Sequence, residues 1–253
     1  MLRSLSIVTL LIACEEAEPE VTPAETAEEI TDVESIPTPS EQVEESDSDD
    51  PDTEQDNTPD PVTIDYRFSD VDSLLYVQVY KDTSAAASAM AHNHVMRAAN
   101  WTGSVSYNID DIDECSMGFS LPVVDLQVDE TAMREYVGYG DSISDSDRAM
   151  IREHMLADNQ LNAASYATIS FDSTTCRLEN DLLVVTGEMT IAGSTKSMDL
   201  DISFSPTNEQ FYMSGVIDFT HSDFNITPYS AFWGAVRNSE PLKISFDMVG
   251  SAI

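Results

Sequence analysis

The sequence predicts an all-β domain of about eight antiparallel strands interrupted by one helical insert. Three observations support this prediction. In segment after segment of the C-terminal part, apolar and polar residues alternate with period two, which is typical of strands with one buried and one solvated face. One segment near the middle has helical spacing instead. About 190 residues carry these patterns without an internal repeat, which suits one domain whose strands either close into a barrel or stack as a sandwich.

The first fourteen residues, "MLRSLSIVTLLIAC", have the pattern of an export signal. One Arg precedes an apolar run that is too short to span a bilayer, and "LIAC" resembles the bacterial lipobox, whose cysteine is lipidated. We expect residues 1–14 to be a lipoprotein signal peptide ending at a lipidated Cys14, with an ordinary signal peptide as the alternative. By resemblance to lipoprotein sorting rules, Glu15 favours an outer-membrane anchor in a Gram-negative-type envelope, facing the periplasm or the cell surface.

Residues 15–61 are expected to form an acidic, disordered tether. They contain 19 of the 47 acidic residues of the chain, many Pro, Ser and Thr, and no Lys, Arg or aromatic residue. The rest of the chain, residues 62–253, has 28 acidic and 10 basic residues, a formal charge of −18. Such a surface repels nucleic acid and anionic headgroups, so neither is expected as a direct partner.

The strands are expected in order along residues 62–253. Two lie at residues 74–80 and around His92, two at 102–108 and 115–126, and five at 167–173, 182–191, 196–205, 211–219 and 242–249. The clearest is the pair 182–191 and 196–205, which "AGST" joins as a hairpin with one apolar and one polar face.

The helical insert follows residue 144. Ser144 or Ser146 can cap a helix whose apolar residues recur at helical spacing; these are Met150, Ile151, Met155 and Leu156. The insert is expected to lie over one end of the sheet, either as a lid or as a connecting helix that covers an apolar edge.

Two cysteines remain once Cys14 is assigned to the lipid anchor. In an oxidising compartment Cys115 and Cys176 can pair, and a bridge closing a loop of about sixty residues stabilises by about 4 kcal/mol in the chain-entropy model. Two separate buried thiols are the alternative, because spacing alone does not establish proximity.

Several segments, from about Tyr66 to the C-terminus, resemble one family in their order and spacing. They are "YRFSDVDSLLYVQVY", "AHNHV", "WTGSVSY", "HMLADNQLNAASYATISFDS" and "VTGEMTIAGSTKSMDLDISF". Together they resemble the YceI-like family of periplasmic lipid-binding proteins. The last segment is the most specific, because it matches the family's hairpin signature at Gly187, Thr190, Ile191, Gly193, Thr195 and Lys196, with Met189 replacing the usual Leu. Two departures are Ala167, where a Pro is common, and His221, roughly where an Arg is common.

The resemblance implies a lipocalin-like antiparallel β-barrel with a long apolar cavity for an isoprenoid chain, a quinone-like lipid or a fatty amide. The candidate ligand-binding residues are His92, His94, Trp101, Phe171, Met189, Met198, Phe204, Met213 and Trp233. The Met and Phe positions belong to the inward-facing sets of the expected strands, where they either line a tunnel or fill an ordinary core.

The pair His92 and His94 has three readings. Residues i and i+2 of a strand share a face, so both side chains can reach one metal ion, although a zinc or copper site needs further ligands. The resemblance favours a structural role or hydrogen bonds to a ligand headgroup. Catalysis has little support, because the chain lacks a G-x-S-x-G elbow, an H-E-x-x-H helix and a Gly-rich phosphate loop.

We therefore expect a non-catalytic lipid-binding lipoprotein that needs no cofactor and holds an isoprenoid, quinone-like or other long apolar ligand for transport or storage in the cell envelope. Its expected partners are this small lipid and the membrane that its N-terminal lipid anchors. The alternatives are a metal-binding envelope lipoprotein centred on the His-x-His strand and an interaction module that uses the exterior of the sheet. The sequence indicates no oligomeric state.

Overall fold

The computed structural model describes residues 62–253, which fold into twelve strands and two α-helices. The expected signal peptide, the lipidation of Cys14 and the tether over 15–61 lie outside the described residues. The strands are β1 (Ile64–Ser69), β2 (Leu74–Lys81), β3 (His94–Ala98), β4 (Thr102–Tyr107), β5 (Ser116–Pro122), β6 (Leu126–Val128), β7 (Thr168–Glu179), β8 (Leu182–Ile191), β9 (Ser194–Pro206), β10 (Gln210–Thr220), β11 (Ser230–Ala231) and β12 (Val236–Ala252); the helices are α1 (Thr131–Tyr136) and α2 (Asp145–Leu156).

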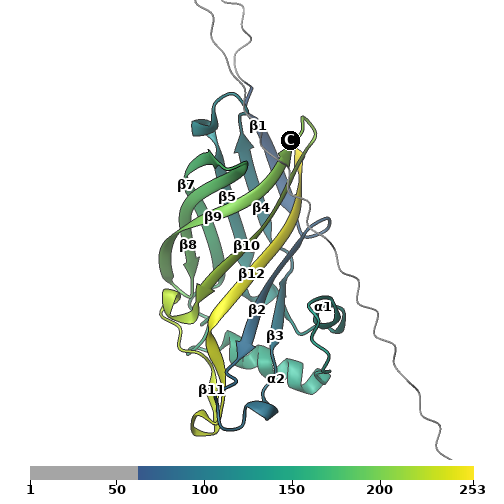
Figure 1. The fold of residues 1–253 in the computed structure, drawn as a ribbon, viewed down its shortest axis with the longest axis vertical. Coiled ribbons are helices and arrows are strands. Elements are labelled where there is room, and N and C mark those ends of the chain that lie inside the picture. The colour runs from purple at the N-terminus through teal and green to yellow at the C-terminus, as the bar shows by residue number, and fades with distance from the viewer. Residues whose placement is uncertain (1–61) are drawn as a thin grey trace, which may run out of the picture. The chain divides into compact units, whose positions relative to one another are not determined.

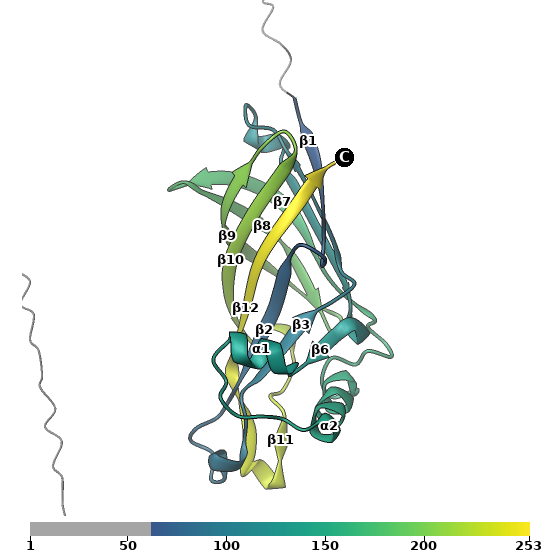
Figure 2. The same cartoon turned by 90° about the vertical axis from the view of Figure 1, so that its right-hand side faces the viewer.

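Eight strands close into an antiparallel barrel in the order β1-β4-β5-β7-β8-β9-β10-β12, and the pairing of β1 with β12 completes the ring (Figure 1). The long strand β12 also pairs with β2, and β2 is followed by β3 and β6 (Figure 2). This confirms the predicted all-β barrel of about eight strands with a helical insert. Among residues 62–253, no helix has the length and apolar character needed to cross a bilayer.

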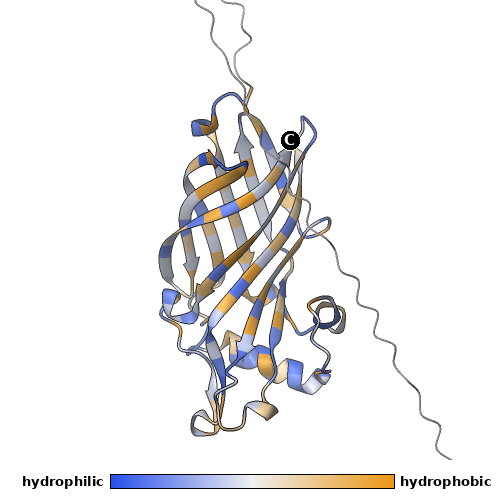
Figure 3. Ribbon diagram, viewed as in Figure 1, coloured by the Kyte–Doolittle hydropathy of each residue, from blue (hydrophilic) through white to orange (hydrophobic). Residues whose placement is uncertain are grey.

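Period-two patterning builds the wall of the barrel. Along β10, Phe211, Met213, Ile217 and Phe219 are buried and alternate with exposed or half-buried neighbours. Figure 3 shows the same alternation as apolar and polar bands along the strands. One face of each strand therefore supplies the interior and the other faces water.

The predicted hairpin over residues 182–205 is confirmed as β8 and β9, which pair in register from Leu183↔Ile202 to Ile191↔Ser194. The turn between them holds Ala192 and Gly193 at φ values of 49° and 76°. Gly193 also lies so close to the Tyr166 ring that a Cβ would overlap it, so both the turn and the packing require glycine.

The helical insert begins where the sequence predicts. Ser144 is the N-cap of α2, and its hydroxyl accepts a hydrogen bond from the backbone N–H of Asp147. The short helix α1, which the sequence did not predict, precedes it and packs near β3.

Two expected strands differ in detail. The strand expected around His92 begins at His94, where the β2–β3 pairing ends at Val79↔His94. Before it, the side chain of Asn93 accepts a hydrogen bond from the backbone N–H of Lys81 (3.0 Å) in place of strand pairing. Because β3 therefore excludes His92, His92 and His94 do not share one face of a strand. The strand expected over 115–126 breaks at a 3₁₀ turn, Val123–Asp125, between β5 and β6.

Aromatic residues fill the end of the barrel that holds the C-terminus. The ring centroid of Phe211 lies 5.2 Å from that of Tyr66, 5.6 Å from Tyr107 and 6.0 Å from Phe204. We call these four residues the aromatic plug. The hydroxyl of Tyr66 donates to the carbonyl of Thr207 (2.6 Å), which ties the plug to the β9–β10 turn. This end of the barrel is therefore packed by its own side chains.

The predicted disulfide is also present. Cys115 and Cys176 are joined, link β7 to the segment before β5, and lie in the same buried cluster as the plug. The reading as two separate thiols was therefore wrong.

Candidate ligand-binding cavity

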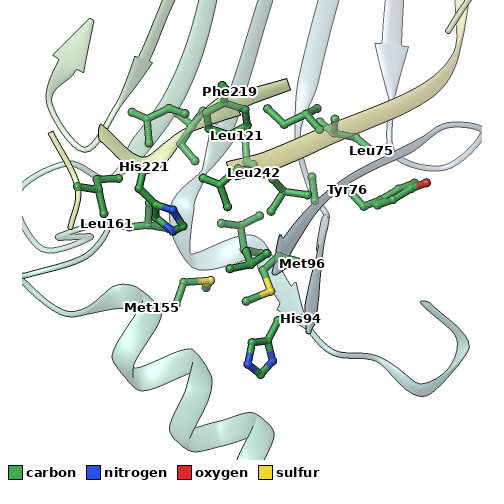
Figure 4. Close-up of a pocket in the computed structure, with 18 of the residues that line it drawn as sticks. Leu75, Tyr76, His94, Met96, Leu121, Met155, Leu161, Phe219, His221 and Leu242 are labelled. Carbon is green, nitrogen blue, oxygen red and sulfur yellow. The ribbon is translucent and has the colours of Figure 1, made fainter. Parts of the chain in front are cut away.

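A cavity of about 640 Å³ occupies the barrel interior away from the aromatic plug. This volume falls within the range of about 300–1,000 Å³ typical of small-molecule sites. Its wall comes mainly from inward-facing apolar residues of the strands, and none of the four plug residues lines it. Figure 4 shows part of this wall, including Leu121, Phe219 and Leu242.

The cavity reaches the surface at the end opposite the plug. Three residues that line it are largely exposed: Met90 at 70%, Met150 at 50% and Phe232 at 69%. They come from the β2–β3 connection, from α2 and from the turn between β11 and β12. These three segments therefore surround the mouth of the cavity.

Helix α2 forms one side of the mouth. Met150, Ile151, His154 and Met155 of this helix line the cavity, and Figure 4 shows Met155 extending from α2 toward Met96 of β3. The loop after α2 is fastened across the opening, because Gln160 Nε2 donates to the carbonyl of Thr227 (3.0 Å). The insert thus contacts β6 and contributes to the binding surface.

Six of the nine residues that the sequence singled out line the cavity: His92, His94, Trp101, Phe171, Met189 and Met213. The other three do not. Phe204 belongs to the aromatic plug, Met198 packs against the core without reaching the cavity, and Trp233 is fully exposed in the turn between β11 and β12. Alternation places Met198 and Phe204 on the correct face of β9, but it does not indicate their level along the barrel axis.

All four histidines of the chain line this cavity. His94 Nδ1 lies 2.6 Å from Asp129, and His92 Nδ1 is paired with Asp141. His221 Nδ1 lies 3.0 Å from the carbonyl of Glu240, and the His154 ring packs 5.0 Å from that of Tyr229. The sequence drew attention to the first pair by spacing; His154 and His221 are brought in by the fold.

His221 is held as a neutral side chain. Burial lowers its pKa below the ordinary value, and the carbonyl of Glu240 only partly offsets that effect. Because Nδ1 faces a carbonyl, it carries the proton, and Nε2 is left as an acceptor.

An ion network with a buried centre joins His92 to His94. Arg134 of α1 is 2% exposed and donates to Asp129 (2.7 Å), to the carbonyl of Asn93 (2.8 Å) and to both the carbonyl and the side chain of Asp141. The resulting chain runs His94–Asp129–Arg134–Asp141–His92. The network therefore fixes Nδ1 of both histidines on the protein side and leaves Nε2 of each for other contacts.

The network also keeps its carboxylates ionised. Burial alone would raise the pKa of Asp129, but hydrogen bonds from His94, the Val95 N–H and Arg134, together with the charge of His94, bring that pKa below its ordinary value. The hydrogen bond from His92 is the largest cause that lowers the pKa of Asp141, to about 2. No sequence signal pointed to Arg134, Asp129 or Asp141, because their meeting depends on α1.

Trp101 supplies a further polar group. It is 2% exposed and lines the cavity, and within residues 62–253 its indole Nε1 is the one buried side-chain nitrogen or oxygen without a hydrogen-bond partner. Buried donors are normally paired, so a ligand oxygen is the chemistry that suits this atom.

The lining of the cavity is mostly apolar. Within the described part of the chain, residues 62–253, no three His, Cys, Asp or Glu side chains are grouped to hold a metal ion. The cavity combines an apolar wall with polar groups at a few points, a combination that is typical of sites for small, mostly apolar molecules.

Comparisons with known proteins found a family model and several solved structures similar to this chain. The model of the YceI-like domain matches residues 77–249. The solved structure of Burkholderia cenocepacia BcnA is 15% identical, with 69% of this chain and 95% of that chain covered and a TM-score of 0.50. A Campylobacter jejuni YceI protein is 13% identical, with 62% and 83% covered and a TM-score of 0.43. No curated protein sequence matches the chain.

The family match covers well over half of the chain and runs from β2 into β12. The solved structure of BcnA has a similar fold. The resemblance inferred from the hairpin signature is thereby confirmed, and this chain belongs to the YceI-like family.

Proposed function

We propose that this protein is a non-catalytic carrier that holds one long apolar molecule, such as an isoprenoid or a quinone-like lipid, in its barrel. The observation that carries the proposal is the 640 Å³ cavity, which is walled by apolar side chains, closed by the aromatic plug at one end and open at the other. Burying an apolar chain there contributes about 25 cal/mol per Å², enough for useful affinity without covalent chemistry.

The polar groups support one position for the headgroup of the proposed ligand. His92 and His94 are held by the ion network near the mouth, so a tail that fills the interior leaves its polar end beside them. Because Nδ1 of each ring faces a carboxylate, the neutral ring presents Nε2 as an acceptor, which suits a ligand hydroxyl. Trp101, His92, His94, Phe171, Met189 and Met213 are the proposed ligand contacts.

The location that fits this role is the cell envelope. A lipidated Cys14 would anchor residues 62–253 through the tether at 15–61, and the Cys115–Cys176 disulfide suits an oxidising compartment outside the cytoplasm. Radiolabelled palmitate should be incorporated into the full chain in cells and lost in Cys14→Ser. Equal labelling of the variant would remove the anchor from the proposal.

Native mass spectrometry of gently extracted protein tests the carrier role directly. The spectrum should show an added mass that organic solvent extracts, and stripped protein should take up an added polyprenol or quinone in a ratio of one to one. A barrel that is empty after extraction and takes up neither lipid would overturn the proposal.

A matched pair of variants ties uptake to the cavity. Leu200 is buried on the inner face of β9 and lines the cavity, whereas Asp201 is exposed on the outer face. Leu200→Trp should lower ligand uptake because the larger ring enters the cavity, and Asp201→Trp should leave uptake unchanged. Equal uptake by both variants would place the ligand elsewhere.

A further inference from the structure

The turn between β11 and β12 has an unusual backbone. Phe232, Trp233 and Gly234 have φ values of 51°, 55° and 88°, all in the left-handed region. Glycine adopts this region readily, but bulky aromatic residues rarely do, because their Cβ atoms crowd the backbone. Two consecutive aromatic residues are therefore held in a conformation that costs energy.

The same residues are packed little. Trp233 is 104% exposed relative to an extended reference, Phe232 is 69% exposed, and Met90 across the turn is 70% exposed. Met90 belongs to the 3₁₀ turn Ser88–Met90, which is fastened to the β11–β12 turn by a hydrogen bond from Ala87 N–H to the carbonyl of Ala235 (2.8 Å). We call residues 84–91 and 230–236 together the apolar tip. Its exposed side chains contribute little to the stability of the domain.

The apolar tip lies in a gap in the charge pattern. Residues 83–96 and 224–236 contain no Asp, Glu, Lys or Arg, although the chain has 47 acidic and 11 basic residues. At the base of the tip Arg237 donates to Asp82 (2.6 Å), so these two flanking charges are paired. This end of an acidic domain can therefore approach an apolar surface without bringing unpaired charges from the tip with it.

The apolar tip is continuous with the mouth of the cavity. Met90, Ala91, Phe232 and Val236 line the cavity, and Trp233 follows Phe232 directly. Figures 1 and 2 show the β11–β12 turn projecting at the end of the barrel opposite the C-terminus. A molecule that moves into the cavity from a surface in contact with the tip would pass Phe232.

We propose that the apolar tip inserts into the interface of a zwitterionic phospholipid bilayer and places the mouth of the cavity against the membrane. Trp is the side chain most favoured at the boundary between headgroups and acyl chains. A water-insoluble ligand would then pass between bilayer and barrel without crossing water. This inference rests on the proposed carrier function and names the surface with which the carrier exchanges its ligand.

Trp233 itself reports the contact. In the full chain carrying Cys14→Ser and Trp101→Phe, Trp233 is the only tryptophan. With phosphatidylcholine vesicles, its fluorescence should shift to shorter wavelength and be quenched by brominated phosphatidylcholine. Emission that stays that of a water-exposed indole and is not quenched would overturn the inference. A shift that appears without vesicles as protein concentration rises would also overturn it, because it would show contact between two copies.

A pair of variants in the Cys14→Ser chain tests the consequence for exchange. Trp233→Asn suits the left-handed backbone and removes the aromatic ring, and Ile109→Asn removes a side chain that is 73% exposed in the loop after β4. Ubiquinone uptake from vesicles should fall about tenfold for Trp233→Asn, in line with the loss of one inserted aromatic ring, and should be unchanged for Ile109→Asn.

Ubiquinone added from ethanol separates the two proposals. If Trp233→Asn and the parent chain take it up equally from ethanol, and the variant is impaired only with vesicles, the bilayer contact is supported. If both are equally active with vesicles, the inference fails while the carrier function stands. If neither takes up ubiquinone or a polyprenol in either format, the carrier function fails, and the inference fails with it.

Discussion

Removal of the Arg134 guanidinium is expected to be among the most damaging single changes in the domain. Arg134→Met leaves Asp129, which is fully buried, without its permanent cation, and also frees the carbonyls of Asn93 and Asp141. Breaking a buried ion pair from one side costs about 3–5 kcal/mol, because a charge is left without compensation. Of the ionisable side chains that contact Asp129, only His94 then remains, with Nδ1 2.6 Å away.

Thermal and urea unfolding of the oxidised protein would measure this effect. For domains of this size each kcal/mol shifts Tm by about 2–4 °C, so Arg134→Met should lower Tm by about 6–20 °C. Arg134→Lys keeps the charge but loses the planar fork that reaches both Asp129 and Asp141, and an intermediate loss is expected.

An exposed arginine provides the control. Arg177 pairs with Asp199 and Glu179 on the barrel surface, and its side chain is 46% exposed. Arg177→Met should leave Tm nearly unchanged, because water solvates the partners that remain. If Arg134→Met lowers Tm no more than Arg177→Met does, the ion network does not fix α1 and the two histidines, and the assignment of the headgroup position loses its basis.

Three further changes test other parts of the structure. Replacing both cysteines of the disulfide by alanine should cost about 4 kcal/mol in urea unfolding, since the bridge spans 61 residues; an unchanged midpoint would contradict the entropic argument. Because burial lowers the pKa of His221, its neutral form contributes stability above about pH 6.5 that is lost as pH falls. His221→Met should therefore lose less Tm than wild type between about pH 7.5 and pH 5.5; parallel curves would refute this. Gly187→Ala should destabilise by about 1–3 kcal/mol, since its Cβ would lie 2.7 Å from the Asp172 carbonyl oxygen, whereas Gly118→Ala, with 3.6 Å of clearance, should be mild.

The elements that could be predicted from sequence are those fixed by local chemistry. The β8–β9 hairpin follows from alternation on both sides of a turn that needs Gly193, and α2 follows from the Ser144 cap and helical spacing. In both cases the residues that decide the structure lie within one element or its immediate neighbour. The family signature lies in the same hairpin, which is why the resemblance was visible there.

The candidate site was only partly predictable. Alternation identifies the inward face of a strand, but Met213 and Phe204, which pair directly across β10 and β9, have different environments: one lines the cavity and the other belongs to the plug. Trp233 was expected to contact the ligand because it is apolar. The left-handed turn directs its side chain to solvent instead. Position along the barrel axis and backbone handedness both depend on tertiary structure.

The packed end and the open end of the barrel have walls made of different strands. Strand pairing is interrupted between β1 and β2, between β3 and β4, and between β5 and β6. At the packed end, β1, β4 and β5 complete the ring with β7, and side chains from opposite walls meet in the aromatic plug. At the open end, β2, β3 and β6 extend the sheet from β12, and β6 does not pair with β7.

The unpaired edge of β6 lies at the end of the molecule that holds the mouth of the cavity, α2 and the apolar tip. The cavity itself extends into the closed part of the ring, where Phe68 of β1 and Phe171 of β7 line it, as is possible in a barrel of about eight strands. The open edge of β6 needs another element to cover it. Helix α2 supplies that cover and lines the cavity with its apolar side. The disulfide and the plug therefore lie where the ring is complete, whereas the ion network, the mouth of the cavity and the exposed aromatic turn lie at the other end.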